Sequence, residues 1–253
     1  ASGYGRGISE EILGEALQGG KRARVFLATK FTFGVSRQQI LEQCEASLRR
    51  LQTDRLDLLF VHHFDPDTAM DETLRALDDL VTQGKVLYLG VSNWSAWQIA
   101  KAHGIAAGAG LARFECIQPM YNLTKRQAEV EILPFALSEQ VGVIPYSPLA
   151  AGFLTVKYRR DTPLPESARA EGVRQRCMNE PGFTAVDKLE AIGRIHNATI
   201  AQTAIAWVLA NTAVSSAIIG ANSLAQLEET VWGASVPLSA QDKAALDETM
   251  AWQ

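Results

Sequence analysis

The sequence predicts an α/β protein with parallel strands, and three observations support this fold class. Short apolar segments typical of strands alternate with longer segments of helical spacing along the 253 residues. The short segments are apolar on both faces, as in parallel strands that other layers cover. Polar side chains follow nearly every one of them. A strand–helix order that repeats in this way indicates a parallel sheet with right-handed crossover connections.

Six strands are predicted, at residues 25–30, 57–63, 86–93, 113–122, 141–148 and 214–220. Helices with apolar residues three and four positions apart are predicted at residues 36–52, 68–84, 95–107, 128–140, 185–196, 200–209, 223–234 and 239–250. Another short helix begins at Ser9, before the first strand. Ser36 is the predicted N-cap of its helix, because a serine hydroxyl accepts a hydrogen bond from a backbone N–H of the first turn.

The favoured architecture is a (β/α)8 barrel, the TIM barrel, in one domain over residues 1–253. A doubly wound open sheet stays as the alternative, because such a sheet needs no fixed number of strands. A barrel needs eight strands, and the sequence shows about six. The segment around Ser9 reads like the interior of a domain, so we expect the first two barrel strands to be missing from this chain, before Ala1.

One long connection, residues 153–184, shows no clear helical or strand period. It contains three prolines, two glycines and five arginines. A connection of this length in a compact domain is usually functional or disordered. We therefore expect either a mobile, basic loop that acts as a flap, or a merely solvated insertion.

The composition argues against several classes of function. A net charge of −4 offers no basic surface for nucleic acid. No apolar run approaches the roughly 20 residues that cross a bilayer, so no membrane partner is expected. The three cysteines, Cys44, Cys116 and Cys177, are far apart and form no CxxC motif. We expect reduced thiols in a cytoplasmic protein, without a metal site.

Polar side chains collect where the predicted strands end. Because the carboxyl ends of barrel strands meet at one rim, we expect these side chains to share one site. The residues at these positions are Lys30, His62, His63, Ser92, Asn93, Gln118, Tyr146 and Ser147.

Tyr4, Lys30 and His62 suggest a reaction. A tyrosine hydroxyl has a pKa near 10, which is too high for easy proton transfer at neutral pH. A nearby ammonium group favours the phenolate and lowers that pKa, so the pair becomes a usable general acid. A histidine at the same place can orient a carbonyl oxygen by a hydrogen bond. Such a set suits protonation of a carbonyl oxygen while another group delivers hydride to the carbon.

Seven segments together resemble the aldo-keto reductases over essentially the whole chain. These segments are YGRGISEEILGEAL, ATK, LLFVHHFDP, GKVLYLGVSNW, QPMYNL, PYSPLAAGFL and IIGANSLAQLEE, and their order also matches. The resemblance implies a TIM barrel, a nicotinamide cofactor bound without a Rossmann domain, and reduction of aldehydes or ketones. The absence of a GxGxxG motif agrees with it.

The resemblance also implies roles for single residues. Tyr4 matches the proton donor, Lys30 the lysine that tunes it, and His62 the histidine that orients the substrate. The residues expected to hold the nicotinamide carboxamide are Ser92, Asn93 and Gln118. Those expected at the nicotinamide ring and the pyrophosphate are Tyr146, which stacks on the ring, and Ser147 and Leu149. Those expected near the adenosine end are Gly220, Asn222, Ser223, Gln226 and Glu229.

Two departures from the family pattern stand out. The fourth catalytic residue of the family is an aspartate in a phrase that would fall before Ala1. The missing segment is either unseen, removed or never encoded. Residues 220–229 also hold no arginine or lysine to bind the 2′-phosphate of NADP. The resemblance favours NADP(H), because relatives usually bind it. The lack of a cation in residues 220–229 keeps NAD(H) as the alternative.

The substrate is specified only as a small aldehyde or ketone. Aromatic residues near the strand ends favour an apolar or aromatic carbonyl compound. The expected lining residues are His63 and Trp94, together with Phe31, Phe33, Phe64 and Tyr121. Two other functions stay open: a cofactor-binding regulatory subunit of the same fold, like the channel-associated members of the family, and an inactive truncated paralogue. The oligomeric state is not specified.

Overall fold

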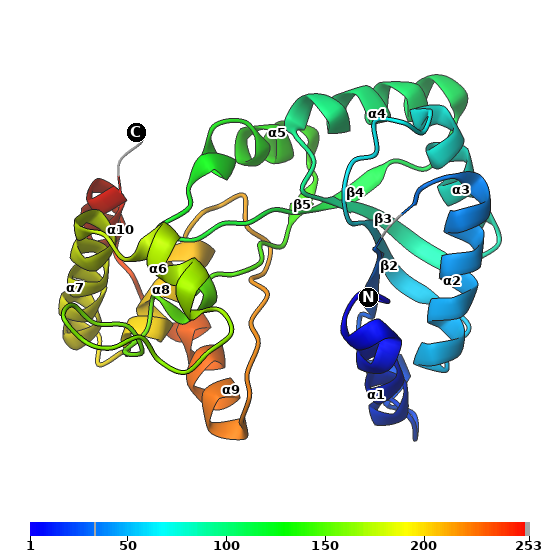
Figure 1. Cartoon of the computed structure of the whole chain (residues 1–253). Coiled ribbons are helices and arrows are strands. Elements are labelled where there is room, and N and C mark those ends of the chain that lie inside the picture. The colour runs from blue at the N-terminus through cyan, green and yellow to red at the C-terminus, as the bar shows by residue number, and fades with distance from the viewer. Residues whose placement is uncertain (33, 251–253) are drawn as a thin grey trace. The chain divides into compact units, whose positions relative to one another are not determined.

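The chain forms two compact units, Ala1–Gln118 and Pro119–Gln253. This computed structural model describes residues 1–32 and 34–250 of them, so Phe33 lies outside the described residues. Figure 1 follows the elements along the chain, from blue at the N-terminus to red at the C-terminus.

The first unit contains a parallel sheet of four strands. These strands are β1 (Ala28–Phe31), β2 (Leu56–Val61), β3 (Val86–Ser92) and β4 (Phe114–Gln118). Each strand pairs with the next in parallel, with Lys30 opposite Phe60 and Phe60 opposite Gly90. Close packing explains the glycine at position 90, because a Cβ there would lie 2.6 Å from the Phe60 ring.

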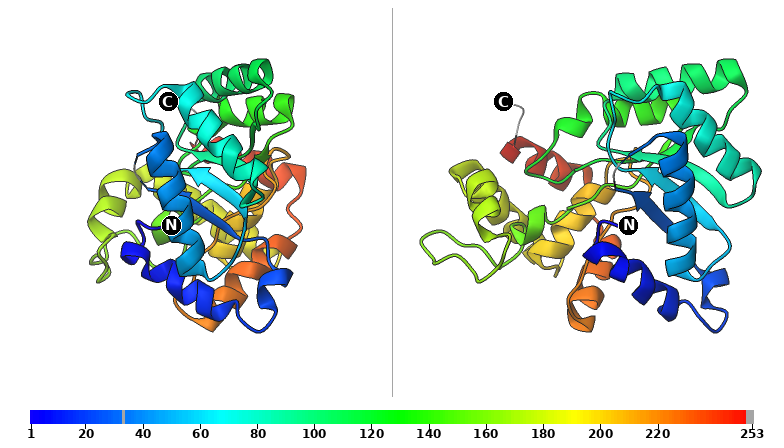
Figure 2. Two further views of the ribbon diagram at one scale, coloured as in Figure 1. Left: turned by 90° about the vertical axis from the view of Figure 1, so that its right-hand side faces the viewer. Right: turned by 45° about the vertical axis from the view of Figure 1, so that its right-hand side comes forward.

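The helices of this unit follow the strands in turn. They are α1 (Ile8–Ala16), α2 (Arg37–Leu51), α3 (Met70–Thr82) and α4 (Ala96–Ala109). Figure 2 shows α2, α3 and α4 along one face of the sheet, and neighbouring helices pack on one another. Ser36 is the N-cap of α2, as predicted, but its hydroxyl and its backbone N–H both donate to the Gln39 side-chain oxygen. Buried Ile40 and Cys44 of α2 belong to the resulting core.

The second unit is mostly helical. Its helices are α5 (Ile132–Glu139), α6 (Ala170–Cys177), α7 (Glu180–Ile195), α8 (Ile200–Leu209), α9 (Leu224–Val231) and α10 (Ala240–Asp247). Helix α8 is nearly all apolar and buried, because α7 and α9 both pack against it. The strand of this unit is β5 (Gly142–Val143). In neither unit is any described helix both long enough and apolar enough to span a membrane.

The prediction of a sixth strand at residues 214–220 is wrong. This segment runs beside β5 through one parallel bridge, between Val143 and Val214. The Ser215 N–H donates to the Val143 carbonyl oxygen over 2.8 Å. The Val143 N–H donates in turn to the Ser215 hydroxyl oxygen instead of to a backbone carbonyl. Further along, the Ile218 N–H donates to the Pro145 carbonyl oxygen, but a proline has no N–H to donate in return, so no regular ladder forms.

The parallel α/β class is confirmed for the sheet of the first unit. The described residues contain five strands, and the eight-stranded barrel remains a prediction.

The expectation for residues 153–184 is partly wrong. This segment contains α6 and the first turn of α7, which begins at Glu180 with Asn179 as its N-cap. Pro181 lies in the first turn, where a proline needs no hydrogen-bonded N–H. Prolines and glycines disfavour a helical prediction, so the sequence pattern did not reveal these two helices. Mobility of the segment stays a prediction.

The charge expected for this segment is also partly neutralised. Arg160 forms ion pairs with Glu180 and Asp187 and lies 4.9 Å from the centre of the Phe183 ring. Arg174 pairs with Glu171 one helical turn earlier. These contacts neutralise two of the five arginines, Arg160 and Arg174, within the second unit.

Candidate active site

The carboxyl ends of β1 and β2 form one edge of the first unit's sheet. The parallel register pairs Lys30 with Phe60 and Phe31 with Val61. His62 follows directly after β2. Lys30 and His62 therefore come to the same edge, as the sequence predicts, because parallel strands end on the same side.

Tyr4 lies next to both of these residues, although it precedes the sheet. Its ring centre is 5.6 Å from the Lys30 ammonium nitrogen. Its ring also meets the His62 ring edge-on, with 6.4 Å between the ring centres. The Tyr4 side chain is 50% exposed, so its hydroxyl is open to a ligand or to solvent. We call Tyr4, Lys30 and His62 the strand-edge triad.

Lys30 is held in surroundings that disfavour its charge. Its ammonium nitrogen lies 5.7 Å from the centre of the Phe60 ring, in addition to its contact with Tyr4. Burial lowers the pKa of Lys30. No carboxylate within residues 1–32 and 34–250 forms an ion pair with it. Lys30 thus lies against two aromatic rings, those of Tyr4 and Phe60.

His62 is neutral near pH 7. Burial, the neighbouring His63 and the Lys30 charge together lower the pKa of His62 to about 4. The two histidine rings stack with 4.5 Å between their centres. The His62 Nδ1 atom is buried and has no hydrogen-bond partner among the described residues. A neutral imidazole with a free nitrogen can donate to or accept from a ligand, according to its tautomer.

The ends of β2, β3 and β4 are tied together by side chains. The Ser92 hydroxyl donates to the Gln118 carbonyl oxygen over 2.8 Å. The Asn93 amide donates to the Ser92 hydroxyl and to the His62 carbonyl oxygen, both over 3.1 Å. Asn93 has a φ of 58°, a left-handed conformation that asparagine tolerates better than most residues. The structure thus brings Ser92, Asn93 and Gln118 together, as predicted.

A small pocket opens beside His62 in the first unit. Its volume is about 200 Å³. Its walls combine apolar rings with imidazoles and one carboxylate. The residues that line it are Phe31, Thr32, Gly34, Val35, His62, His63, Phe64 and Asp65. His63 is therefore placed where a substrate residue was predicted.

Trp94 lies behind this pocket and is not among its lining residues. Its ring meets Phe64 edge-on at 5.0 Å and Phe114 at 5.4 Å. Only 6% of Trp94 is exposed. It therefore supports the Phe64 wall.

Tyr121 was also predicted to line the substrate site, and the structure of the second unit does not support this. Its ring is fully buried and packs on Trp207 with 5.1 Å between the ring centres. Its hydroxyl donates to Glu129 and accepts from Asn211. A side chain that is enclosed and fully hydrogen-bonded in this way is part of the core.

The predicted ring-stacking and pyrophosphate residues lie in a tight loop of the second unit. The Tyr146 N–H donates to the Pro119 carbonyl oxygen over 2.9 Å. Ser147 has a φ of 57°, and its carbonyl oxygen accepts from the Asn122 amide. The carbonyl oxygen of Leu149 accepts from two N–H groups of the turn that follows. Residues 150–152 of that turn also have positive φ values.

Four of the predicted adenosine residues lie at the start of α9 or just before it, and Glu229 lies in its last turn. Ser223 caps this helix, because its hydroxyl accepts from the Gln226 N–H. The Gln226 side chain accepts from the Asn222 N–H over 2.9 Å. Gly220 precedes them with open space where a Cβ would be, and the Glu229 carbonyl oxygen accepts from Gln202. Asn222, Ser223 and Gln226 thus form one exposed capping cluster.

Several supporting residues were missed by reasoning from the sequence. Glu10 is only 2% exposed, and it accepts hydrogen bonds from Thr29 and Arg50. Thr32 accepts a hydrogen bond from the backbone N–H of Gly3. The spacing of Glu10 and Gly14 on one helix face was the available signal for Glu10. No pattern along the chain points to Thr32.

A parallel sheet with a tyrosine, a lysine and a histidine at its carboxyl edge is the arrangement of an α/β enzyme. The sequence profile of the Aldo/keto reductase family matches residues 1–251. The chain therefore belongs to the aldo/keto reductase family, a family of oxidoreductases.

Three relatives illustrate the range of the family. A probable voltage-gated potassium channel subunit beta from Arabidopsis thaliana is 35% identical over 244 residues, or 90% of this chain and 74% of that protein. A putative voltage-gated potassium channel subunit beta from Schizosaccharomyces pombe is 35% identical over 248 residues, or 90% of this chain and 72% of that protein. The versiconal hemiacetal acetate reductase of Aspergillus parasiticus is 33% identical over 276 aligned positions, or 97% of this chain and 80% of that protein.

Proposed function

We propose that this protein reduces aldehydes or ketones to alcohols with NADP(H), and that Tyr4 donates the proton. The observation that supports this most is the strand-edge triad, in which Tyr4 lies beside both Lys30 and His62. Membership of the aldo/keto reductase family agrees with it. The family also supports a single (β/α)8 domain over residues 1–253 in a cytoplasmic protein.

The triad residues have separate tasks in this reaction. Proton transfer to the carbonyl oxygen leaves a phenolate on Tyr4. The Lys30 ammonium, 5.6 Å from the ring centre, stabilises that negative charge. Neutral His62 donates a hydrogen bond to the same carbonyl oxygen and so orients the substrate.

The residues at the strand ends fit the nicotinamide end of the cofactor. A carboxamide has one acceptor oxygen and two donor N–H groups, and a hydroxyl and two amide side chains can match them. Ser92 and Asn93 supply the hydroxyl and one amide, and Gln118, which lies opposite Ser92 in the β3–β4 register, supplies the other amide. The bound cofactor supplies hydride to the substrate carbon. Tyr146 would stack on its ring, and Ser147 and Leu149 would contact the pyrophosphate.

The pocket beside His62 suggests the substrate class. Phe31, Phe64 and Val35 offer apolar surface, and the volume of about 200 Å³ admits a small ring. The Asp65 carboxylate accepts from the Asp67 N–H and the Thr68 hydroxyl, which lower its pKa, so it stays ionised. A fixed negative charge disfavours anionic substrates. We propose a neutral apolar or aromatic carbonyl compound that contacts His63.

The test is the Tyr4→Phe variant. It removes one hydroxyl group, so turnover of a neutral aromatic aldehyde should fall at least 100-fold while NADPH binding is kept. Tyr88→Phe is the matched control, because Tyr88 is exposed and belongs to the middle of β3. Full activity of Tyr4→Phe would contradict the proposal.

A second function is supported by the names of two relatives. The Arabidopsis and Schizosaccharomyces proteins are named as channel beta subunits, which favours a channel-associated subunit as the alternative. That alternative predicts NADPH binding with negligible turnover of aldehydes and ketones. It also predicts a stable complex with a channel protein. Steady-state assays, together with light scattering of the purified protein with and without a channel domain, separate the two functions.

A further inference from the structure

The segment that carries Tyr4 is attached to the end of β1. The Gly3 N–H donates to the Thr32 hydroxyl oxygen over 2.8 Å. The hydroxyl oxygens of Ser2 and Thr32 are 3.1 Å apart and share a second hydrogen bond. The contact is close, because a Cβ at Gly3 would lie 2.7 Å from the Thr32 side chain. Thr32 thus holds the chain one residue before Tyr4.

The other side of Tyr4 is attached through Glu10. The buried Glu10 carboxylate accepts from the Thr29 hydroxyl and from Arg50. The Arg50 side chain in turn lies against Gly7, where a Cβ would be 2.7 Å from the Arg50 Cδ. Helix α1 and the turn after Tyr4 are therefore held close to β1.

Both attachments belong to the strand that carries Lys30. Thr29 comes immediately before Lys30, and Thr32 comes two residues after it. The Tyr4 side chain itself is half exposed, and the contacts given above for its ring are those with Lys30 and His62. Its position over Lys30 depends on what holds its backbone.

We propose that Thr32 is a positioning residue for the reduction: its hydroxyl holds the Gly3 N–H and so keeps the Tyr4 phenol beside Lys30. The inference rests on the proposed role of Tyr4 as the proton donor. The Thr32 hydroxyl supplies the acceptor that fixes the Gly3 N–H in place, and valine of nearly the same shape lacks it. Loss of the acceptor frees the segment, and a small misplacement of a reacting group slows catalysis.

The experiment compares Thr32→Val, Thr32→Ser and the control Thr162→Val. Thr162 is exposed, and its hydroxyl donates to the Arg159 carbonyl oxygen in the second unit. Thr32→Val should lower kcat about fivefold with an unchanged NADPH Kd and thermal midpoint. Thr32→Ser should restore kcat, since it keeps the acceptor. Thr162→Val should match the unaltered protein.

The outcomes separate this inference from the proposed function. An unchanged kcat for Thr32→Val, with Tyr4→Phe inactive, would overturn the inference and leave the function standing. An active Tyr4→Phe variant would overturn both. If Thr32→Val does not fold, the Gly3→Ala variant tests the inference instead. The added methyl group would push against the Thr32 side chain from the other side of the contact. A fall in kcat with unchanged NADPH binding then supports the inference, and an unchanged kcat overturns it.

Discussion

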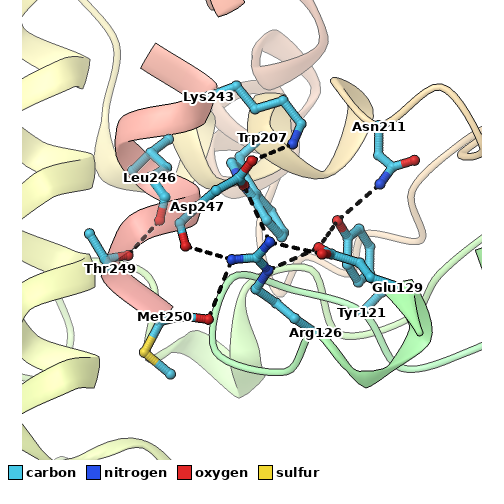
Figure 3. A network of polar contacts seen from close by, with 10 residues as sticks. All are labelled: Tyr121, Arg126, Glu129, Trp207, Asn211, Lys243, Leu246, Asp247, Thr249 and Met250. Atoms are coloured by element: carbon cyan, nitrogen blue, oxygen red, sulfur yellow. Dashed lines mark hydrogen bonds and ion pairs between the residues drawn. The ribbon is translucent and has the colours of Figure 1, made fainter. Parts of the chain in front are cut away.

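Arg126 and Asp247 are 121 residues apart in the chain, and the Arg126 Nη1 group donates a 2.6 Å hydrogen bond to the Asp247 carbonyl oxygen (Figure 3). The same guanidinium binds both oxygens of Glu129. The Asp247 carboxylate accepts from the Trp207 indole and from Lys243. This network fastens the end of α10 to the segment near residue 126 within the second unit.

Arg126→Met should destabilise the protein by about 3 kcal/mol, because it leaves the partly buried Glu129 carboxylate without its cation. Burial opposes the charge of Arg126, but its bonds to Glu129 and the charge of Asp247 raise its pKa, so it is always charged. Arg126→Lys keeps the charge but loses the bidentate contact with Glu129, so it should lose less stability than Arg126→Met. Urea denaturation followed by tryptophan fluorescence measures both variants. Equal stability of all three proteins would contradict this role.

Gly14→Ala should destabilise the first unit by about 2 kcal/mol, since overpacking forces the backbone to move. A Cβ at Gly14 would lie 2.5 Å from the Arg50 carbonyl oxygen and 2.8 Å from the Leu51 carbonyl carbon. The matched control is Gly104→Ala in α4, where a Cβ meets open space. That control should stabilise the protein by roughly 0.5–1 kcal/mol through helix propensity. Chemical denaturation gives both values, and a stabilising Gly14→Ala would show that α1 is not packed closely on α2.

The stability of the protein should depend on His62 between about pH 6.5 and pH 4. Burial, His63 and Lys30 lower the pKa of His62 from 6.5 to about 4 in the folded chain. The unfolded chain therefore binds more protons in this range. The contribution of neutral His62 is present above pH 6.5 and is lost as the pH falls toward 4.

His62→Gln removes this titration, so its stability should fall less steeply than that of the unaltered protein between those pH values. Urea denaturation at pH 7, 5.5 and 4.5 measures the difference, and proton NMR of the four histidines follows the His62 ring directly. A His62 ring that titrates near pH 6.5 would contradict the burial seen here.

Asn222→Arg should raise the preference for NADPH over NADH about tenfold. Asn222 is exposed beside the cap of α9, and residues 220–229 hold no arginine or lysine. A guanidinium there would bind the 2′-phosphate with a charge-assisted contact that NADH cannot make. Kd values for both cofactors measure the ratio, and Asn222→Gln is the uncharged control. An unchanged ratio of the two Kd values would indicate that the adenosine end of the cofactor does not bind beside Asn222.

The strands of the first unit and most helices were predictable because their signals are local. Apolar periodicity located β1 to β4, and Ser36 as a predicted N-cap located the start of α2. The Lys30 and His62 positions followed from the rule that parallel strands end at one edge. Tyr4 was assigned to the site from the family resemblance and from the chemistry of its phenol.

Other features depended on contacts between distant residues, which no local pattern contains. Residues 214–220 look like a strand, yet Ser215 takes the Val143 N–H with its side chain. Residues 170–183 look irregular, yet burial of Val173 and Phe183 stabilises two helices there. Tyr121 looks like a binding residue and is a core residue.

The sequence by itself determined the parallel α/β class, the family and the residue types at the carboxyl edge of the sheet. These depend on periodicity and on side-chain identity, which each position carries alone. Only the tertiary structure decided that Thr32 holds the backbone before Tyr4 and that Glu10 joins α1 to β1. The physical reason is that a hydrogen bond between residues 29 or 19 positions apart is formed only when folding brings its donor and acceptor together.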